Sequence, residues 1–380
     1  MQEDDPRVPS GASLSRTQKR RALLTLALGL AVMTVVFVGI LPQVIDYEAV
    51  WETLTSLSPA SLATLLLAGL LYPVPEGGNY AATVPGLSWW RGIKAWLASD
   101  GVGKTVPGLD FVTRFGMYRS WGCTGAEATR GMFLSGAIDW SVKFAMPAVA
   151  AVLLVIAGVT DLGYVAVFAA IGSVAAVLIL GPIIVAVRSE RATSWLAARG
   201  EALSAWGLRR LKRAPVADVG ARIVEFRNDT AEVAGKRIWR AAAASAAGKL
   251  WQFVILLLAL RAVGVPADVV GWDELFIVFA LVILITMIPL TPGGIGIAEF
   301  FYIAFLSEIA GKEWASILAA GVMLYRVFQW ALPIPIGWTV TLRWRRQVQR
   351  GDLPDPFAPG DVGPARSEVS GQDLGSGDAG

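Results

Sequence analysis

Long apolar runs constrain the fold of this chain more than any other feature of its sequence. They cover about residues 22–41, 131–158, 162–187 and 241–260. About 20 apolar residues in a helix cross the hydrocarbon core of a bilayer. The 380 residues are 55% hydrophobic and only 17% charged, with a mean hydropathy of +0.56. These values are typical of integral membrane proteins and unusual for soluble domains. We therefore expect an all-α, polytopic transmembrane helix bundle.

The first apolar run is the first span in this interpretation. Four basic residues between positions 16 and 21 precede it. A secretory signal peptide has the same order, but its apolar core is shorter and ends in a small-residue cleavage site. Here the run ends in Leu41-Pro42-Gln43, which favours an uncleaved span. Basic residues stay on the cytoplasmic side, so residues 1–20 are expected to be a disordered cytoplasmic N-terminus.

The largest extramembrane segment is expected at residues 188–240. It has twelve basic and six acidic residues, an excess that predicts a cytoplasmic loop. Tryptophans and leucines among the arginines favour a basic amphipathic helix on the inner leaflet; a solvated loop helix is the alternative. The membrane domain is expected to span residues 21–345, with 346–380 as a disordered cytoplasmic tail. Two cytoplasmic termini require an even number of crossings, and we count eight, in a plasma membrane.

The second apolar segment, about Leu62–Pro75, is short for a span. Pro73, Pro75 and the pair Gly77-Gly78 interrupt it, because proline and glycine weaken helices. The sequence does not decide whether residues 79–106 cross the membrane, re-enter it or lie flat at its surface.

The stretch 291–299 lies between two apolar runs and combines a proline, three glycines and a carboxylate. Thr291 suits an N-cap and Pro292 the first helical position. Gly293, Gly294 and Gly296 leave the backbone unobstructed. Free N–H groups at a helix start bind anions, so we expect these five residues to meet a lipid phosphate. The alternative is close helix packing through small residues.

Glu299 ends this stretch and needs a partner at membrane depth. A regular helix from Pro292 places it about 10 Å along the axis, and Lys249 lies about 12 Å into its own span. We therefore predict that Glu299 pairs with Lys249, with Arg326 as the second candidate. An unpaired carboxylate would instead be protonated and could couple transport to protons.

The earlier stretch Pro107-Gly108 to Arg114 resembles 291–299. Each has Pro-Gly and a charged residue seven positions after the proline, and such pairs of broken segments mark the site in internally repeated transporters. Chance is the alternative, because Pro-Gly is a common turn dipeptide. Asp139 and Lys143, four residues apart in an apolar run, suit an intrahelical ion pair or a place in a polar pathway.

Several function classes are excluded by composition. The chain has no histidine, and Cys123 is its one cysteine, so intrachain disulfides, Cys/His zinc sites and histidine-based catalysis are ruled out. No Walker motif is present to use ATP. Nucleic-acid binding is not expected, and we expect no cofactor and no metal.

The motifs resemble those of one known family, the lysylphosphatidylglycerol synthase transmembrane domain (flippase-like) proteins. The resemblance rests on Pro289 to Glu299, Tyr325-Arg326, Leu332 to Gly337, Val106 to Arg114, and Asp139. Ser135-Gly136 replace the acid-arginine pair that usually precedes the aspartate. The family implies a bundle that moves lipids between leaflets. Larger members add a soluble aminoacyl-transferase domain, which we do not expect in this chain.

We therefore expect a membrane protein that binds and translocates a phospholipid or a polyprenyl-linked glycolipid, and is not an enzyme. The alternatives are an ion-coupled transporter of a small polar solute, a membrane-embedded lipid-carrier transferase, or a structural subunit. The expected intramembrane polar pathway consists of Glu299, Arg326, Tyr325, Lys249, Arg114, Asp139 and Lys143.

Overall fold

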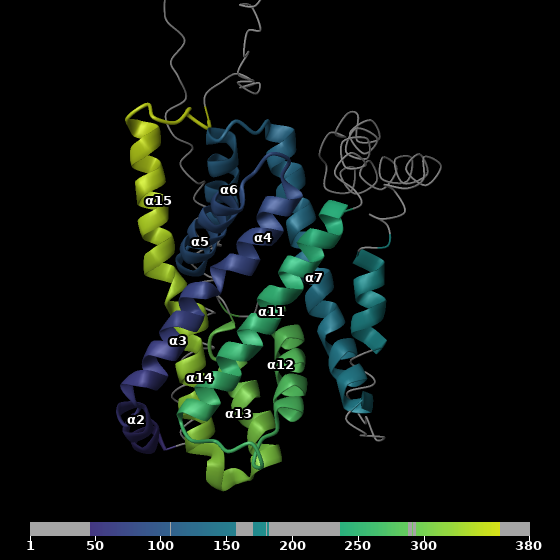
Figure 1. Ribbon diagram of the computed structural model, residues 1–380, viewed down its shortest axis with the longest axis vertical. Coiled ribbons are helices and arrows are strands. Elements are labelled where there is room, and N and C mark those ends of the chain that lie inside the picture. The colour runs from purple at the N-terminus through teal and green to yellow at the C-terminus, as the bar shows by residue number, and fades with distance from the viewer. Residues whose placement is uncertain are drawn as a thin grey trace, which may run out of the picture. The chain divides into compact units, whose positions relative to one another are not determined.

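A computed structural model describes residues 46–106, 108–156, 170–179, 181, 236–287, 291 and 294–357. All regular structure among them is helical, and they contain no strand, which confirms the all-α prediction (Figure 1). Among the described residues, three helical stretches are long and apolar enough to cross a membrane: Pro59–Thr83, Arg237–Ala262 and Lys312–Gln349. The count of eight crossings remains a prediction.

Several predicted features lie outside the described residues. They are the N-terminal segment 1–20, the first apolar run 22–41, most of the run 162–187, most of the loop 188–240, and the tail beyond Phe357. The last helix, α15 (Pro333–Gln349), extends past the predicted domain boundary at residue 345.

The described residues form two compact units. Those of unit 1 fall within Met1–Gly69, Lys143–Ser173 and Gln252–Ala331, and those of unit 2 within Leu70–Val142, Val174–Trp251 and Leu332–Gly380. The long helices α3 (Pro59–Leu71), α7 (Gly125–Ile156) and α11 (Lys236–Ala262) contribute residues to both units.

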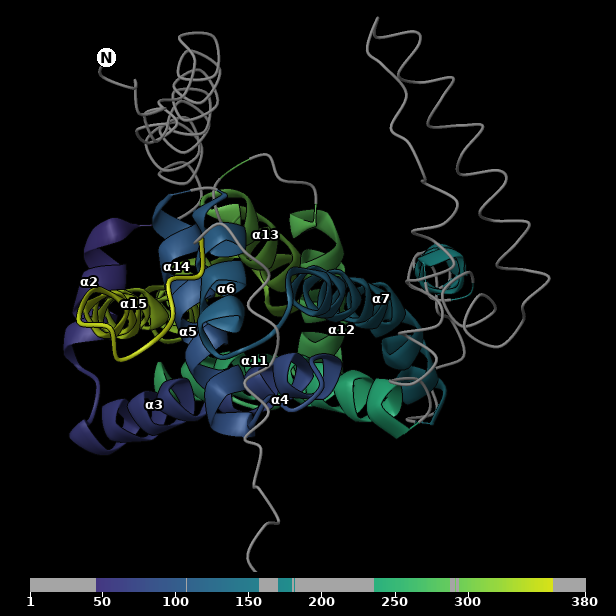
Figure 2. The same cartoon turned by 90° about the horizontal axis from the view of Figure 1, so that it is seen from above.

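Unit 2 is built around α5 (Trp89–Thr105), which packs against α4 (Pro73–Thr83), α6 (Leu109–Ser120) and α15. Figure 2 shows α5, α6 and α15 grouped together from above. Glycines allow the closest approach: a Cβ on Gly101 would lie 2.8 Å from the Pro333 carbonyl oxygen, and one on Gly337 would collide with the Leu97 carbonyl. Small residues at such crossings let the backbones approach and gain van der Waals contact.

Unit 1 contains α2 (Tyr47–Thr55), α12 (Trp272–Thr286), α13 (Ile297–Ala310) and α14 (Ala315–Arg326). The helices α12 and α13 pack side by side, as Figures 1 and 2 both show, and α14 packs on α13 and α2. The rings of Phe253 and Phe276 meet edge-on with their centroids 5.0 Å apart. The Asp46 N–H donates to the Ser316 hydroxyl at 3.0 Å.

The second apolar segment, which looked short for a span in the sequence, is extended by a further helix. After an interruption at Tyr72, the chain continues as α4 to Thr83. Pro73 is tolerated because it occupies the start of α4, where a missing N–H leaves no helical hydrogen bond unmade. The open question about residues 79–106 is answered at the level of helices: they hold the end of α4 and all of α5.

The long helical stretch Lys312–Gln349 also contains a break. Its 38 residues would be about 57 Å long as one α-helix, well beyond the hydrocarbon thickness of about 30 Å. It begins with the short 3₁₀ turn η4 (Lys312–Trp314) and passes from α14 to α15 through the π-helical segment η5 (Val327–Ala331). Pro333 and Pro335 follow, so the break coincides with residues that cannot donate helical hydrogen bonds.

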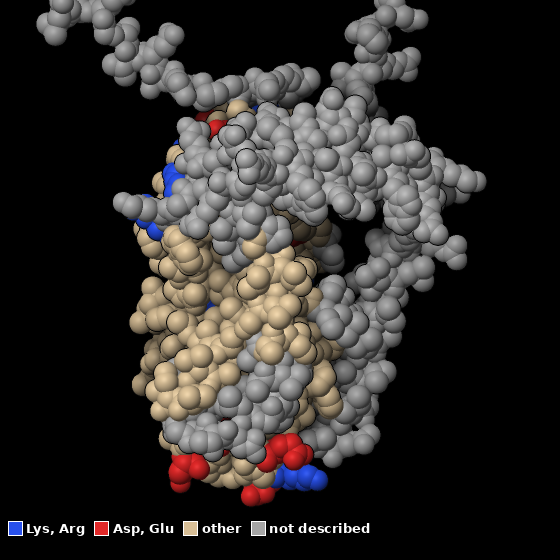
Figure 3. Space-filling model, turned by 90° about the vertical axis from the view of Figure 1, so that its right-hand side faces the viewer, with Lys and Arg blue, Asp and Glu red and all other residues tan. Residues whose placement is uncertain are grey.

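Apolar side chains face outward on α3. One leucine of α3, Leu65, is buried, with 1% of its surface exposed. The other five leucines of the helix are exposed: Leu62, Leu66, Leu67, Leu70 and Leu71. Figure 3 shows another face, on which most of the described surface is free of charged residues. Lipid tails solvate such surfaces at no cost, whereas water does not.

Candidate functional site: buried charge clusters in the two units

A buried charge cluster in unit 2 is centred on Lys249 of α11. Its ammonium nitrogen lies 2.7 Å from Glu76 Oε1 and 2.9 Å from Asp139 Oδ1. The Ser245 hydroxyl donates to the same Asp139 oxygen at 3.2 Å. Lys249 and Glu76 are each only 3% exposed. Gly248 makes room for the cluster, because any Cβ there would collide with the Glu76 carboxylate.

The predicted Glu299–Lys249 pair is wrong. The carboxylates that neutralise Lys249 come from α4 and α7, and Glu299 binds another cation. Helix rise per residue estimates only depth in the membrane; it does not say which helices are neighbours. Glu76 was missed altogether. The signal was present in Pro73-Val74-Pro75-Glu76-Gly77-Gly78, a carboxylate among helix-weakening residues in an apolar run.

The second cluster lies in unit 1 and joins Glu299 to Arg326. The Arg326 Nε donates to Glu299 Oε1 at 2.6 Å, and the Gly296 N–H donates to Oε2 at 2.7 Å. The Glu299 side chain is 4% exposed and that of Arg326 is 13% exposed. The guanidinium carbon of Arg326 also lies 5.6 Å from the centroid of the Trp330 ring. Arg326, the second candidate from the sequence, is therefore the partner of Glu299.

The helix that carries Glu299 starts later than predicted. It begins at Ile297, with Gly296 as its N-cap at φ +82°, and not at Pro292. Gly294 also has a positive φ, +69°, so the backbone turns here in a region that favours glycine. Glu299 is consequently in the first helical turn, where its carboxylate caps the backbone and interacts well with the helix dipole.

The proposed phosphate-binding stretch is only partly described. Thr291 is 6% exposed, and its hydroxyl has no hydrogen-bond partner among the described residues. Pro292 and Gly293 lie outside them. The Gly296 N–H is already bound by Glu299, so this donor is not free for a ligand. The role of the stretch in binding phosphate remains a prediction.

Arg114 of α6 forms the centre of the first-half motif. It is 7% exposed, and its guanidinium carbon lies 4.5 Å from the Tyr80 ring centroid. Gly108, at φ +86°, is the N-cap of α6, as Gly296 is of α13. Pro107 lies outside the described residues. Arg114 is the sixth residue of its helix and Glu299 the third, so the seven-residue spacing does not place the two charges at equivalent helical positions.

The remaining predicted pathway residues are Asp139, Lys143 and Tyr325. Lys143 is half-buried on α7, one turn beyond Asp139. The sequence pointed only to Lys143 as a partner for Asp139. The structure shows Asp139 bound to Lys249 of α11. Tyr325 packs edge-on against Tyr302, with ring centroids 5.8 Å apart.

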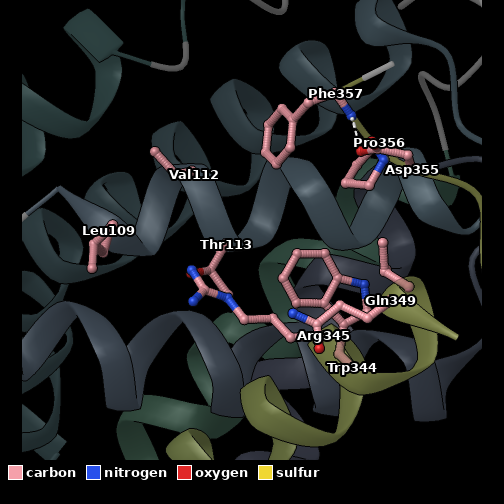
Figure 4. Close-up of a pocket in the computed structure, with 10 residues that line it drawn as sticks. Leu109, Val112, Thr113, Trp344, Arg345, Gln349, Asp355, Pro356 and Phe357 are labelled. Carbon is pink, nitrogen blue, oxygen red and sulfur yellow. Dashed lines mark hydrogen bonds between the residues drawn. The ribbon is translucent and has the colours of Figure 1, made fainter. Parts of the chain in front are cut away.

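A surface cavity of about 230 Å³ lies elsewhere in unit 2 (Figure 4). It is formed by α6, α15 and the segment after α15, where the Phe357 N–H donates to Asp355 Oδ1 at 3.0 Å. Figure 4 shows Arg345 beside Thr113, with Trp344 between Arg345 and the terminal segment. None of the predicted pathway residues lines this cavity.

The clusters are suited to holding charge in an apolar surrounding. Among the described residues, no group of three or more His, Cys, Asp or Glu side chains could hold a metal ion. What the geometry provides is ion pairs joined to hydroxyl and backbone groups. Such groups in membrane helices mark the path of a polar substrate or ion.

Comparison with known proteins identifies the family of the chain. No curated protein matches the chain. The family model for the lysylphosphatidylglycerol synthase TM region matches residues 19–337, which include both charge clusters and most of the described helices. The chain therefore belongs to the lysylphosphatidylglycerol synthase TM region family of membrane proteins.

Proposed function

We propose that this chain is a multi-pass plasma-membrane protein that binds a phospholipid or a polyprenyl-linked glycolipid and moves it between the two leaflets. It acts without an aminoacyl-transfer reaction and without ATP. Its transport is passive or coupled to a proton or other ion gradient. Family membership supports the lipid-handling part of this proposal.

One observation carries the translocation step. In the part of the chain that the structure describes, each of the three apolar stretches that could cross a membrane has a charged side chain that is buried or half-buried. Pro59–Thr83 carries Glu76, Arg237–Ala262 carries Lys249, and Lys312–Gln349 carries Arg326. Placing a charged side chain at the centre of a membrane helix costs about 2.5–3.5 kcal/mol on scales derived from membrane insertion. A lipid headgroup that crosses the bilayer needs polar groups in the membrane interior. The buried charges would provide them.

Lipid scrambling in liposomes tests the proposal. Purified protein is reconstituted with fluorescent phospholipid, and a membrane-impermeant quencher reports the lipid that changes leaflet. We expect the wild type to accelerate quenching over protein-free liposomes. Glu299→Gln removes the charge and leaves one acceptor oxygen where Gly296 and Arg326 each use one. We expect it to lower the rate by about tenfold or more, because Arg326 loses its counter-charge.

Glu308→Gln is the matched control. Glu308 is on the same helix, α13, but is exposed, so its loss should leave the rate unchanged. Equal rates for the wild type and Glu299→Gln would move the transport site away from Glu299. No acceleration with either a phospholipid or a polyprenyl-linked glycolipid would contradict translocation. Counter-flow of a water-soluble solute would then favour a transporter of small polar solutes.

A further inference from the structure

The buried cations of the described chain differ in how they are neutralised. Lys249 has two carboxylates within 3 Å and Arg326 has one. Arg114 is buried to the same degree, yet no carboxylate of a described residue lies within 4.0 Å of it. Asp110, one turn earlier on α6, acts on it electrostatically from farther away. Arg114 therefore keeps a positive charge without an ion-pair partner in this part of the chain.

The contacts of Arg114 are aromatic rings and a hydroxyl. The Tyr80 ring lies over the guanidinium at 4.5 Å and the Phe111 ring at 5.9 Å. One terminal nitrogen donates to the Ser135 hydroxyl at 3.4 Å, which is a long bond. The Nε atom is buried and has no acceptor among the described residues. Cation–π contacts offset only part of the cost of burying a guanidinium.

A second polar group near Arg114 also lacks a partner. Tyr118 follows Arg114 by one helical turn on α6, is fully buried, and acts on it electrostatically. The Tyr118 hydroxyl makes no hydrogen bond to any described residue. Buried polar groups are nearly always hydrogen-bonded, so a guanidinium with an unpaired Nε beside an unpaired phenol indicates a group that both can contact. Both donate hydrogen bonds, and an anion with several oxygens accepts them.

We propose that Arg114 and Tyr118 form a binding site for a phosphate group. This inference rests on the proposed function, because it identifies the part of the lipid that the protein recognises. A guanidinium matches two phosphate oxygens in a planar, bidentate arrangement, and the Tyr118 hydroxyl can donate to a third. The site is separate from the glycine-rich stretch 291–296, whose Gly296 N–H is already bound by Glu299.

The surface next to Arg114 suits a lipid as the carrier of that phosphate. Phe111 and Val112 on the same helix are 57% and 50% exposed, and Phe111 also contacts the guanidinium. An acyl chain can pack on these two side chains while the phosphate meets Arg114. Free phosphate has the same charge chemistry, so the experiment includes it as a separate probe.

The test measures ligand-induced stabilisation of the full chain in detergent. The probes are dioctanoyl phosphatidylglycerol, dioctanoylglycerol, which lacks the phosphate, and inorganic phosphate. We expect phosphatidylglycerol to raise the thermal midpoint of the wild type and dioctanoylglycerol not to raise it, because a ligand that binds only the folded state stabilises it. We expect Arg114→Met to abolish the shift. Arg114→Lys, which keeps the charge but loses the planar fork, should raise the Kd about 10- to 100-fold.

Arg119→Met is the matched control. Arg119 is on the same helix and also 7% exposed, but its guanidinium donates to the Cys123 carbonyl at 3.4 Å. This variant should keep the lipid-induced shift. Ligand-free Arg114→Met should unfold at the same temperature as the wild type or higher, because it removes a buried charge without orphaning a carboxylate. If Arg114 served only to stabilise the fold, ligand-free Arg114→Met would unfold at a lower temperature than the wild type.

The outcomes separate this inference from the proposed function. Folded Arg114→Met or Arg114→Lys with an unchanged lipid response would overturn the phosphate site, as would a wild type that responds equally to dioctanoylglycerol. An Arg114-dependent response to inorganic phosphate alone supports a site for the free ion. If the wild type scrambles lipid but the lipid-induced thermal shift does not depend on Arg114, only this inference is contradicted. If the thermal shift depends on Arg114 but the protein does not scramble lipid, only the proposed function is contradicted.

Discussion

At the scale of single residues, Glu299 combines two tasks. One carboxylate oxygen caps the start of α13 and the other binds Arg326. Removing one partner of a buried ion pair leaves the other charge uncompensated, which costs about 3–5 kcal/mol. Removing both partners together costs less, because no charge is orphaned.

This difference gives a prediction for Arg326. We expect Arg326→Met to lower the free energy of unfolding by about 3–5 kcal/mol. The double variant Arg326→Met/Glu299→Met should be destabilised by less than the sum of its single variants, with a loss of about 1 kcal/mol remaining for the helix cap. The free energy of unfolding of the wild type, the two single variants and the double variant can be measured by titrating SDS into detergent micelles. Strict additivity of the two substitutions would show that the pair is not energetically coupled.

Sequence alone predicted part of this residue-level arrangement. It identified Lys249, Arg326, Glu299 and Asp139 as charges in apolar surroundings, because charges there are costly and need partners. It proposed the wrong partner for Lys249, because a helix contact depends on rotation and neighbour identity as well as depth. Arg114 was singled out by its distance from Pro107. Its special feature is that no carboxylate of a described residue lies within 4.0 Å of it, which depends on tertiary packing.

At the scale of elements, the two helices that follow Pro-Gly motifs share one device. Gly108 precedes α6 at φ +86° and Gly296 precedes α13 at φ +82°. A residue with a Cβ is strained in this region by about 1–2 kcal/mol. The sequence predicted a helix start at the second motif, but placed it at Pro292 by proline preference. It could not show that Gly296, four residues later, would be the N-cap.

Two glycines of unit 2 provide a matched test of this backbone requirement. At both Gly108 and Gly136 an added Cβ would meet no atom within 4 Å, but only Gly108 has a positive φ. We expect Gly108→Ala to destabilise the protein by about 1–2 kcal/mol. Gly136→Ala, inside α7, should be neutral or stabilise by up to about 1 kcal/mol. Unfolding free energies measure both, and equal effects would mean that the left-handed conformation is not required.

Across the whole molecule, the buried ion pairs are poorly explained by stability alone. Replacing such pairs with apolar residues is often neutral or stabilising, yet each unit contains one: Lys249 with Glu76 and Asp139 in unit 2, and Arg326 with Glu299 in unit 1. Membership in a lipid-handling membrane family gives these charges a context. Lipid translocation also requires a defined orientation in the bilayer, which the charges at the helix ends predict.

Basic residues gather at the end of α15, at Arg343, Arg345, Arg346 and Arg350. The end of α13 and the turn after it have two acids, Glu308 and Glu313, against Lys312. The positive-inside rule therefore predicts that the end of α15 is cytoplasmic and that this turn is on the outer side.

Green fluorescent protein fused after Phe357 should fluoresce, and alkaline phosphatase fused there should be inactive. Alkaline phosphatase inserted at Gly311 should be active, because it folds only outside the reducing cytoplasm. Activity after Phe357 together with inactivity at Gly311 would reverse the orientation, and the same reporter signal at both positions would mean that the stretch from α14 to α15 does not cross the membrane.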